Sequence, residues 1–141
     1  MADDVASALQ KGVRARLRAD AGITAEGVLA IRDQPPQNAG LPYIRLGRMD
    51  VDGDHTGGTR DYIVTFTIEA HTRPAKGGKV EAQRILGAVV SALDRRELQI
   101  TVTGFALCGL DYLTSDVRRQ NDGKTHVGLA VFEARLDAGV F

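Results

Sequence analysis

The sequence predicts an α+β domain in which two helices pack on one face of a mainly antiparallel sheet. Two segments, at about residues 3–20 and 79–95, repeat apolar side chains at the three- and four-residue spacing of a helix. Residues 62–70 instead alternate apolar and polar side chains, as a strand with one buried face does. Several strands fall between and after the helices rather than alternating with them, and this order favours an α+β fold.

The first helix is predicted over about residues 3–20. Its apolar residues recur every fourth position: Val5, Leu9, Val13 and Leu17. Acidic residues near its start and basic residues further along suit the helix dipole. Gly22 is expected to end this helix, because glycine readily adopts the conformation that follows a helix.

Three strands are predicted between the helices. A short apolar strand at residues 27–32 comes first, and prolines stiffen the turn after it and suit the start of a second strand at 43–51. Residues 52–60 are small, polar and rich in glycine, which predicts a mobile surface loop between two antiparallel strands. The alternating strand at 62–70 follows.

A strand at residues 98–103 and a hairpin are predicted after the second helix. The hairpin joins residues 110–119 to a strong strand at 125–136 through a turn rich in Asn, Asp and Gly. The last strand is apolar on both faces. Val127, Leu129 and Val131 lie on one face, and Ala130, Phe132, Ala134 and Leu136 lie on the other. Two readings stay open, since the strand could be covered on both sides or could form a subunit interface.

Composition bounds the remaining possibilities. The 141 residues fit one domain spanning 1–141, and 18 basic residues balance 18 acidic ones, so no net charge draws the chain to DNA or to an anionic membrane. One cysteine, Cys108, excludes an internal disulfide and a zinc site built from cysteines, and its apolar neighbours suggest a small buried side chain. Without a long apolar run or a leader pattern, the chain is expected to be soluble and untargeted.

The acidic residues between positions 50 and 61 match part of the pattern of a calcium-binding loop. Asp50, Asp52 and Asp54 stand at the first, third and fifth positions of such a loop. His55 then replaces the glycine at the sixth position, Asp61 replaces the glutamate at the twelfth, and strands rather than helices flank the segment. A solvated acidic loop is therefore the preferred interpretation.

No constellation of residues predicts an enzyme or a cofactor site. The Lys76-Gly-Gly-Lys79 segment lacks the flanking residues of a phosphate-binding loop. The three histidines are far apart in sequence, and no serine lies in a nucleophile elbow. The sequence therefore predicts a non-enzymatic protein with no catalytic residue, no cofactor and no metal.

Taken in order, the segments resemble the tail terminator, or tail completion, proteins of long-tailed phages and of gene transfer agents. No segment is a catalytic signature, and the resemblance depends on their succession along nearly the whole chain. The segments that carry it are residues 13–20, 33–47, 62–70, 81–93, 110–119 and 121–134.

The resemblance implies a structural protein of the virion, assembled in the cytoplasm of a bacterial host. Members form a six-membered ring at the head–tail junction, where they end growth of the tail tube and join the tail to the head. The implied partners are further copies of the chain, the tail tube protein and the head connector or stopper protein. DNA passes through the ring without sequence-specific binding, and no membrane is involved.

Two polar loops are the candidate contacts with these partners, because exposed loops carry recognition chemistry. The residues proposed are Asp52, Asp54, His55 and Arg60 in the first loop and Arg118, Arg119 and Asp122 in the second. The alternative interpretation of each of these residues is that it lies in a solvated hairpin end and contacts no partner. For the whole chain the alternatives are another neck or minor tail component, a small metal- or ligand-binding domain that uses residues 50–55 and, last, an enzyme.

Overall fold

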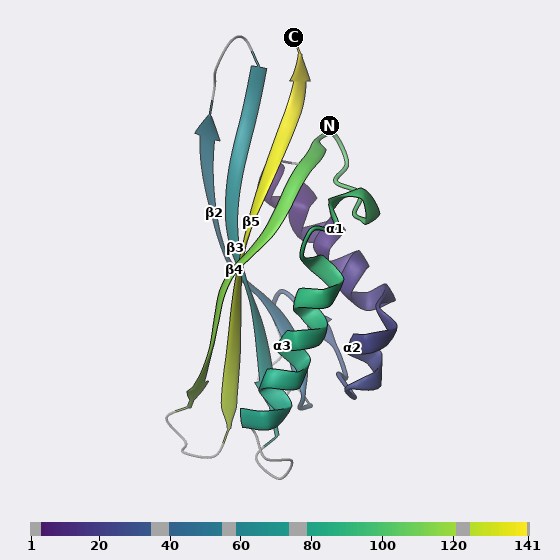
Figure 1. Cartoon of the computed structure of the whole chain (residues 1–141), viewed down its shortest axis with the longest axis vertical. Coiled ribbons are helices and arrows are strands. Elements are labelled where there is room, and N and C mark those ends of the chain that lie inside the picture. Colours follow the sequence, from purple (N-terminus) through teal and green to yellow (C-terminus); the bar gives the residue numbers. More distant parts are fainter. Residues whose placement is uncertain (1–3, 35–39, 55–58, 74–78, 121–124, 141) are drawn as a thin grey trace.

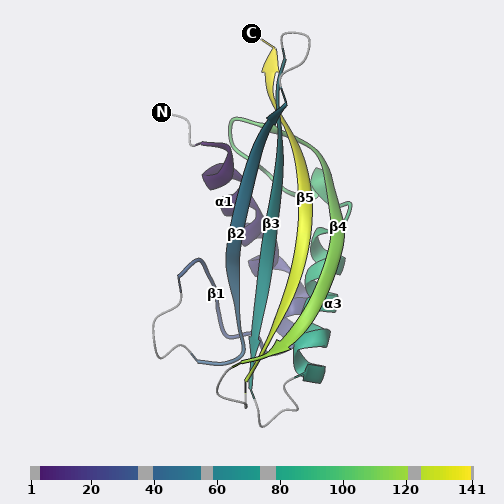
Figure 2. The ribbon, with the colours of Figure 1, turned by 90° about the vertical axis from the view of Figure 1, so that its left-hand side faces the viewer.

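A five-stranded sheet forms the body of the computed structural model, which describes residues 4–34, 40–54, 59–73, 79–120 and 125–140. The strands lie in the order β1-β2-β3-β5-β4 (Figure 2). Their bounds are Ile31–Arg32 for β1, Tyr43–Asp54 for β2, Thr59–Thr72 for β3, Ala106–Arg119 for β4 and His126–Val140 for β5. Every neighbouring pair is antiparallel except β1 with β2, so the predicted, mainly antiparallel sheet is confirmed.

The α-helices of the described residues all lie on one face of this sheet, as Figure 1 shows. They are α1 (Val5–Ala19), α2 (Ala21–Ala25) and α3 (Lys79–Leu93). Beneath them, Phe66 of β3 and Phe132 of β5 stack at 5.5 Å between ring centroids, both almost fully buried. The apolar positions that predicted α1 are buried here as well. This single layer of side chains between helices and sheet is the hydrophobic core.

The helix predicted over residues 3–20 is followed by a second, short helix. Asp20 separates the two, because its carboxylate accepts a hydrogen bond from the amide of Ile23 at 3.0 Å and so caps α2. Asp4 caps α1 in the same way, through the amide of Ser7 at 2.8 Å. The prediction that Gly22 ends the helix was wrong, since Gly22 lies inside α2.

The strand predicted at residues 98–103 was also wrong. A 3₁₀ turn, η2 (Glu97–Gln99), occupies its start, and Ile100 and Val102 then enter the core without joining the sheet. Their alternation therefore reflects burial rather than strand pairing. The segment also packs tightly on α1, where a Cβ atom added to Gly12 would lie 2.4 Å from the carbonyl oxygen of Thr101.

The strands around the first polar loop are longer than predicted. β2 continues to Asp54 and β3 begins at Thr59, so most of the predicted loop at residues 52–60 is strand. Conversely, the strand predicted at residues 27–32 is reduced to Ile31–Arg32. The helix predicted over about residues 79–95 is α3, which begins at Lys79 as predicted and ends two residues earlier, at Leu93.

The last strand, β5, occupies a central position between β3 and β4. Its Ala130, Phe132, Ala134 and Leu136 are buried under the helices. Within the part of the chain that the structure describes, no helix covers the other face, where Leu129 and Val131 are half-buried. The reading of a strand covered on both sides by its own chain was therefore wrong.

Candidate interaction surface

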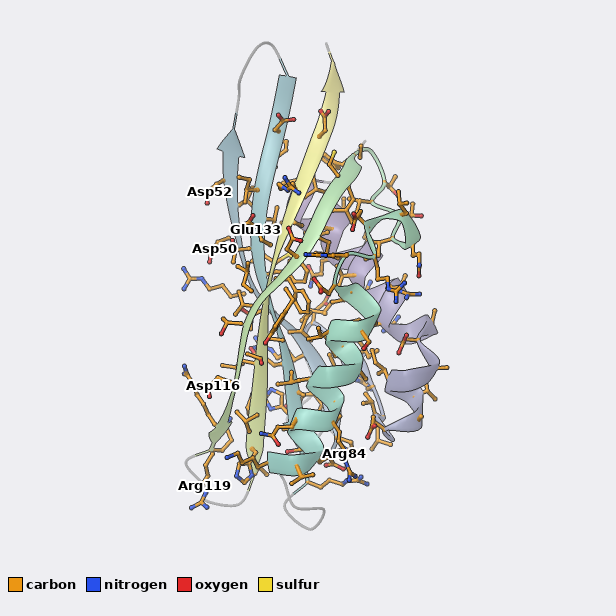
Figure 3. The ribbon with its side chains drawn as sticks, in the orientation of Figure 1. Asp50, Asp52, Arg84, Asp116, Arg119 and Glu133 are labelled. Atoms are coloured by element: carbon orange, nitrogen blue, oxygen red, sulfur yellow. The ribbon has the colours of Figure 1, made fainter. Side chains whose placement is uncertain are left out.

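The face of the sheet opposite the helices, here called the open face, carries most of the charged strand residues. Alternation along each strand fixes which residues point there, because direct partners in the ladder share a face. The described carboxylates on it are Asp50, Asp52, Asp61, Glu69, Asp111, Asp116, Glu133 and Asp137. The arginines of its ladder pairs are Arg45, Arg118 and Arg135, and Arg48 also binds Asp50 at 3.0 Å. Figure 3 shows Asp50, Asp52 and Asp116 pointing away from the helices.

These charges are unevenly distributed, although the whole chain is neutral. At the end nearest the β2–β3 connection, Asp50, Thr65, Glu133 and Asp111 form one row across four strands. Asp61 lies directly opposite Asp137 two rows further on. We call this region the acidic end, comprising Asp50, Asp52, Asp61, Asp111, Glu133 and Asp137.

Two of these contacts place like charges directly across a ladder. Glu133 is the partner of Asp111 on β4, and Asp61 is the partner of Asp137 on β5. Side chains at such positions have Cβ atoms about 5 Å apart, and like charges there destabilise a sheet. The acidic end therefore holds carboxylates at facing positions of the ladder, and Arg48 binds one of its members, Asp50, at 3.0 Å.

The other end of the open face carries a compact, neutralised cluster. Glu69 accepts hydrogen bonds from Arg45 Nη1 at 3.0 Å and pairs with His71 Nε2 at 2.9 Å, while the His71 ring stacks on Tyr43 at 4.5 Å. The hydrogen bond with His71, followed by the charge of Arg45, lowers the pKa of Glu69 despite its burial. Burial, together with the Glu69 charge, raises the pKa of Tyr43.

Sequence reasoning missed this cluster, because the residues that meet in it, such as Arg45 on β2 and Glu69 on β3, are 24 residues apart in sequence. The available signal was the alternation of Tyr43 with Arg45 and of Glu69 with His71, which becomes a cluster only when the register of β2 with β3 is known. Gly47 helps to form it, since a Cβ atom there would lie 2.7 Å from Glu69 Oε2. The glycine lets this carboxylate lie flat against the neighbouring strand.

The predicted contact residues fall at opposite ends of the sheet. Asp52 is exposed on β2 at the acidic end, whereas Arg118 and Arg119 are exposed at the far end of β4. Arg118 points to the open face and Arg119 to the helix side. Within one chain the structure therefore does not bring the two predicted sets together (Figure 3).

Four other predicted contacts are only partly described, or not at all. Asp54 and Arg60 lie at the facing ends of β2 and β3, but their side chains are outside the described part of the structure. His55 and Asp122 lie outside the described residues altogether.

Asp50 and Asp52, considered above as calcium ligands, lie on the open face of β2. Among the residues with described placement, no three or more His, Cys, Asp or Glu side chains gather closely enough to hold a metal ion.

Cys108 is exposed, so its predicted burial was wrong. No helix in the described ranges has the length and apolar character needed to span a membrane.

Comparison with known proteins identifies the family. The family model described as "Tail completion protein gp17" matches residues 11–137. The chain belongs to this tail completion family. It is also similar to a solved chain from the "Virion of native gene transfer agent (GTA) particle", with 30% identity and a TM-score of 0.85 over 94% of this chain and 97% of that one. A search of curated proteins finds no match.

Proposed function

We propose that this tail completion protein forms a ring, of six copies, at the head-proximal end of the tail tube. The ring ends growth of the tube, joins the tail to the head connector at the head–tail junction, and lets DNA pass. The family match over residues 11–137 supports a structural role, and similarity to a chain of a gene transfer agent virion supports a place in the particle. The chain would be assembled in the bacterial cytoplasm and would act without catalysis.

The open face of the sheet gives the strongest structural support for this proposal, because an excess of carboxylates suits the wall of a channel through which DNA passes. It carries eight described carboxylates, against the three arginines of its ladder pairs and Arg48, which binds Asp50 at 3.0 Å. The phosphate backbone of DNA binds strongly to basic surfaces, and such binding would hold the genome in place. An acidic wall repels phosphate instead. This role also gives a reason for the facing carboxylates of Asp111 and Glu133, since like charges at facing positions of a ladder disfavour a strand pair.

The two ends of the sheet would then meet different partners. The acidic end carries Asp52, with Asp54 at the end of β2 and Arg60 near the start of β3, and the opposite end carries Arg118 and Arg119. His55 and Asp122 follow these two groups in sequence. A ring that joins a tube to a connector needs two unlike rims, and these two groups differ in charge. We therefore assign them as the contacts with the tail tube and the connector.

Electron microscopy of particles that lack the chain tests the proposed position. Overlong tails and heads without tails are expected, because nothing would stop the tube or join it. A tagged chain located away from the head–tail junction would favour another neck or minor tail component. The channel wall is tested separately by Glu133→Lys combined with Asp111→Lys, which should leave tail length normal and slow DNA delivery.

A further inference from the structure

The connection between α3 and β4 presents an exposed turn, residues 95–99, which contains η2 and begins two residues after α3 ends (Figure 1). Phe105, further along this connection, meets Tyr62 of β3 edge to face, with 6.0 Å between the ring centroids. Tyr62 pairs with Leu136, which is buried under the helices. Direct partners in a ladder share a face, so the connection lies on the helix side of the sheet.

The backbone of the 95–99 turn is anchored at both ends. Leu93, before it, is fully buried, and Ile100, after it, is 7% exposed. The amide of Arg95 donates a hydrogen bond to the carbonyl of Leu110 at 2.8 Å, and the amide of Arg96 donates to the carbonyl of Leu93 at 3.1 Å. A partner would therefore meet a preformed surface and would lose little free energy to ordering it.

Arg95 adopts a backbone conformation that suits glycine. Its φ is 57°, in the left-handed region, and the described residues other than glycine include no second one with a positive φ. A side chain is strained there, and the residue that follows a helix in this conformation is usually glycine. The hydrogen bond to Leu110 uses the backbone amide, which glycine would also supply. The arginine thus adds strain without adding a backbone contact.

The side chains of the turn combine positive charge with an apolar group. Arg95 and Arg96 are both exposed, and Arg96 Nε makes one long hydrogen bond, to the carbonyl of Ser91 at 3.4 Å. Among the described residues, no carboxylate forms an ion pair with either guanidinium. Leu98 is 96% exposed, more than any other large apolar side chain in the described ranges.

We propose that the 95–99 turn docks another protein of the particle, one that offers an apolar pocket bordered by carboxylates. Leu98 would enter the pocket, which removes apolar surface from water. Arg95 and Arg96 would pair with the carboxylates, because the planar guanidinium gives both strength and orientation to such a contact. The strain at Arg95 would be offset by contacts that exist only in the complex.

DNA is the competing partner, because arginines also bind phosphate. Two observations favour a protein. A phosphate backbone offers no apolar pocket for Leu98, which carries the most exposed apolar surface of the turn. The turn also lies on the helix side of the sheet, so in the proposed ring, whose open face lines the channel, it is outside the path of the DNA. The inference rests on the proposed function in this second respect and adds a docking surface that faces away from the channel.

Arg95→Gly tests the role of the guanidinium apart from the fold. Glycine keeps the backbone bond to Leu110 and relieves the strain, so the melting temperature should not fall. The yield of complete particles, counted by electron microscopy, should nevertheless fall at least fivefold. A melting temperature that falls would show that Arg95 supports the fold, and an unchanged yield would show that no partner needs it. Either result would overturn the proposal.

Leu98→Gln tests the apolar contact in the same way. The side chain is almost fully exposed in the free chain, so its stability should not change, whereas the particle yield should again fall at least fivefold. Leu29→Gln and Arg84→Gln are matched controls, because Leu29 is 66% exposed near β1 and Arg84 is exposed on α3 (Figure 3). Both controls should leave the yield unchanged, and an equal loss in the controls would contradict a specific docking turn.

A photoactivatable crosslinker in place of Leu98, illuminated in assembled particles, identifies what the turn touches. The expected product joins this chain to a different protein of the particle, at a peptide that contains carboxylates. A product with DNA, a product with a second copy of this chain, or no product would overturn the docking turn and leave the proposed ring intact. Particles in which the wild-type chain is absent would overturn the proposed function as well.

Discussion

Glu133→Gln should stabilise the free chain, which is the reverse of the usual effect of changing a half-buried residue. The substitution keeps the size of the side chain and removes its charge from the row that contains Asp50 and Asp111. Like charges directly opposite in a ladder cost about 0.2–1 kcal/mol, and we expect a gain within this range. The melting temperature should then rise by up to about 3 °C, since a 141-residue chain has an unfolding entropy of about 0.3 kcal/mol/K.

Thermal unfolding at low and at high salt measures this effect. At about 1 M salt the Debye length falls to about 3 Å, so the gain should largely disappear. Asp116→Asn is the control, because Asp116 pairs with Arg118 and should not gain stability when neutralised. A lower melting temperature for Glu133→Gln, or a gain that salt does not change, would refute the reasoning about like-charge pairs.

Three further predictions concern the cluster and the core. Glu69→Gln should destabilise the chain by about 1–2 kcal/mol, because it removes the charge that Arg45 and His71 stabilise. Since the folded pKa of Glu69 is lowered from 4.5, its contribution should be present above pH 4.5 and be lost as the pH falls through the folded pKa, as urea unfolding across that range would measure. Gly12→Ala should cost about 1–3 kcal/mol in the same assay, because the new methyl group meets the Thr101 carbonyl, and an unchanged midpoint would contradict this packing. Phe132→Ala should cost about 3–5 kcal/mol by opening a cavity beside Phe66, and a loss below about 1 kcal/mol would show that the site collapses.

The sequence predicted the parts of the fold that local periodicity determines. The four-residue spacing from Val5 to Leu17 and the alternation at residues 62–70 both produced the expected elements, because one buried face imposes each pattern. The alternation at residues 98–103 failed as a signal, since Ile100 and Val102 enter the core from a 3₁₀ turn and a loop. Burial alone does not distinguish such a segment from a strand.

The interaction surface depended on strand register, which no local pattern gives. Asp111 and Glu133 lie on different strands, and their repulsion is apparent only once β4 and β5 are aligned. The same holds for Arg45 with Glu69. Asp52 and Arg118, chosen from composition, lie at opposite ends of the sheet, but the carboxylates gathered at the acidic end could not be predicted from a neutral net charge.

The most direct test of the account is cryo-electron microscopy of the head–tail junction in particles that carry this chain. The account predicts a closed ring of six copies between tube and connector, with Asp50, Asp111 and Glu133 facing the channel and the helices outside. A chain located elsewhere in the particle, or a ring whose helices line the channel, would contradict it.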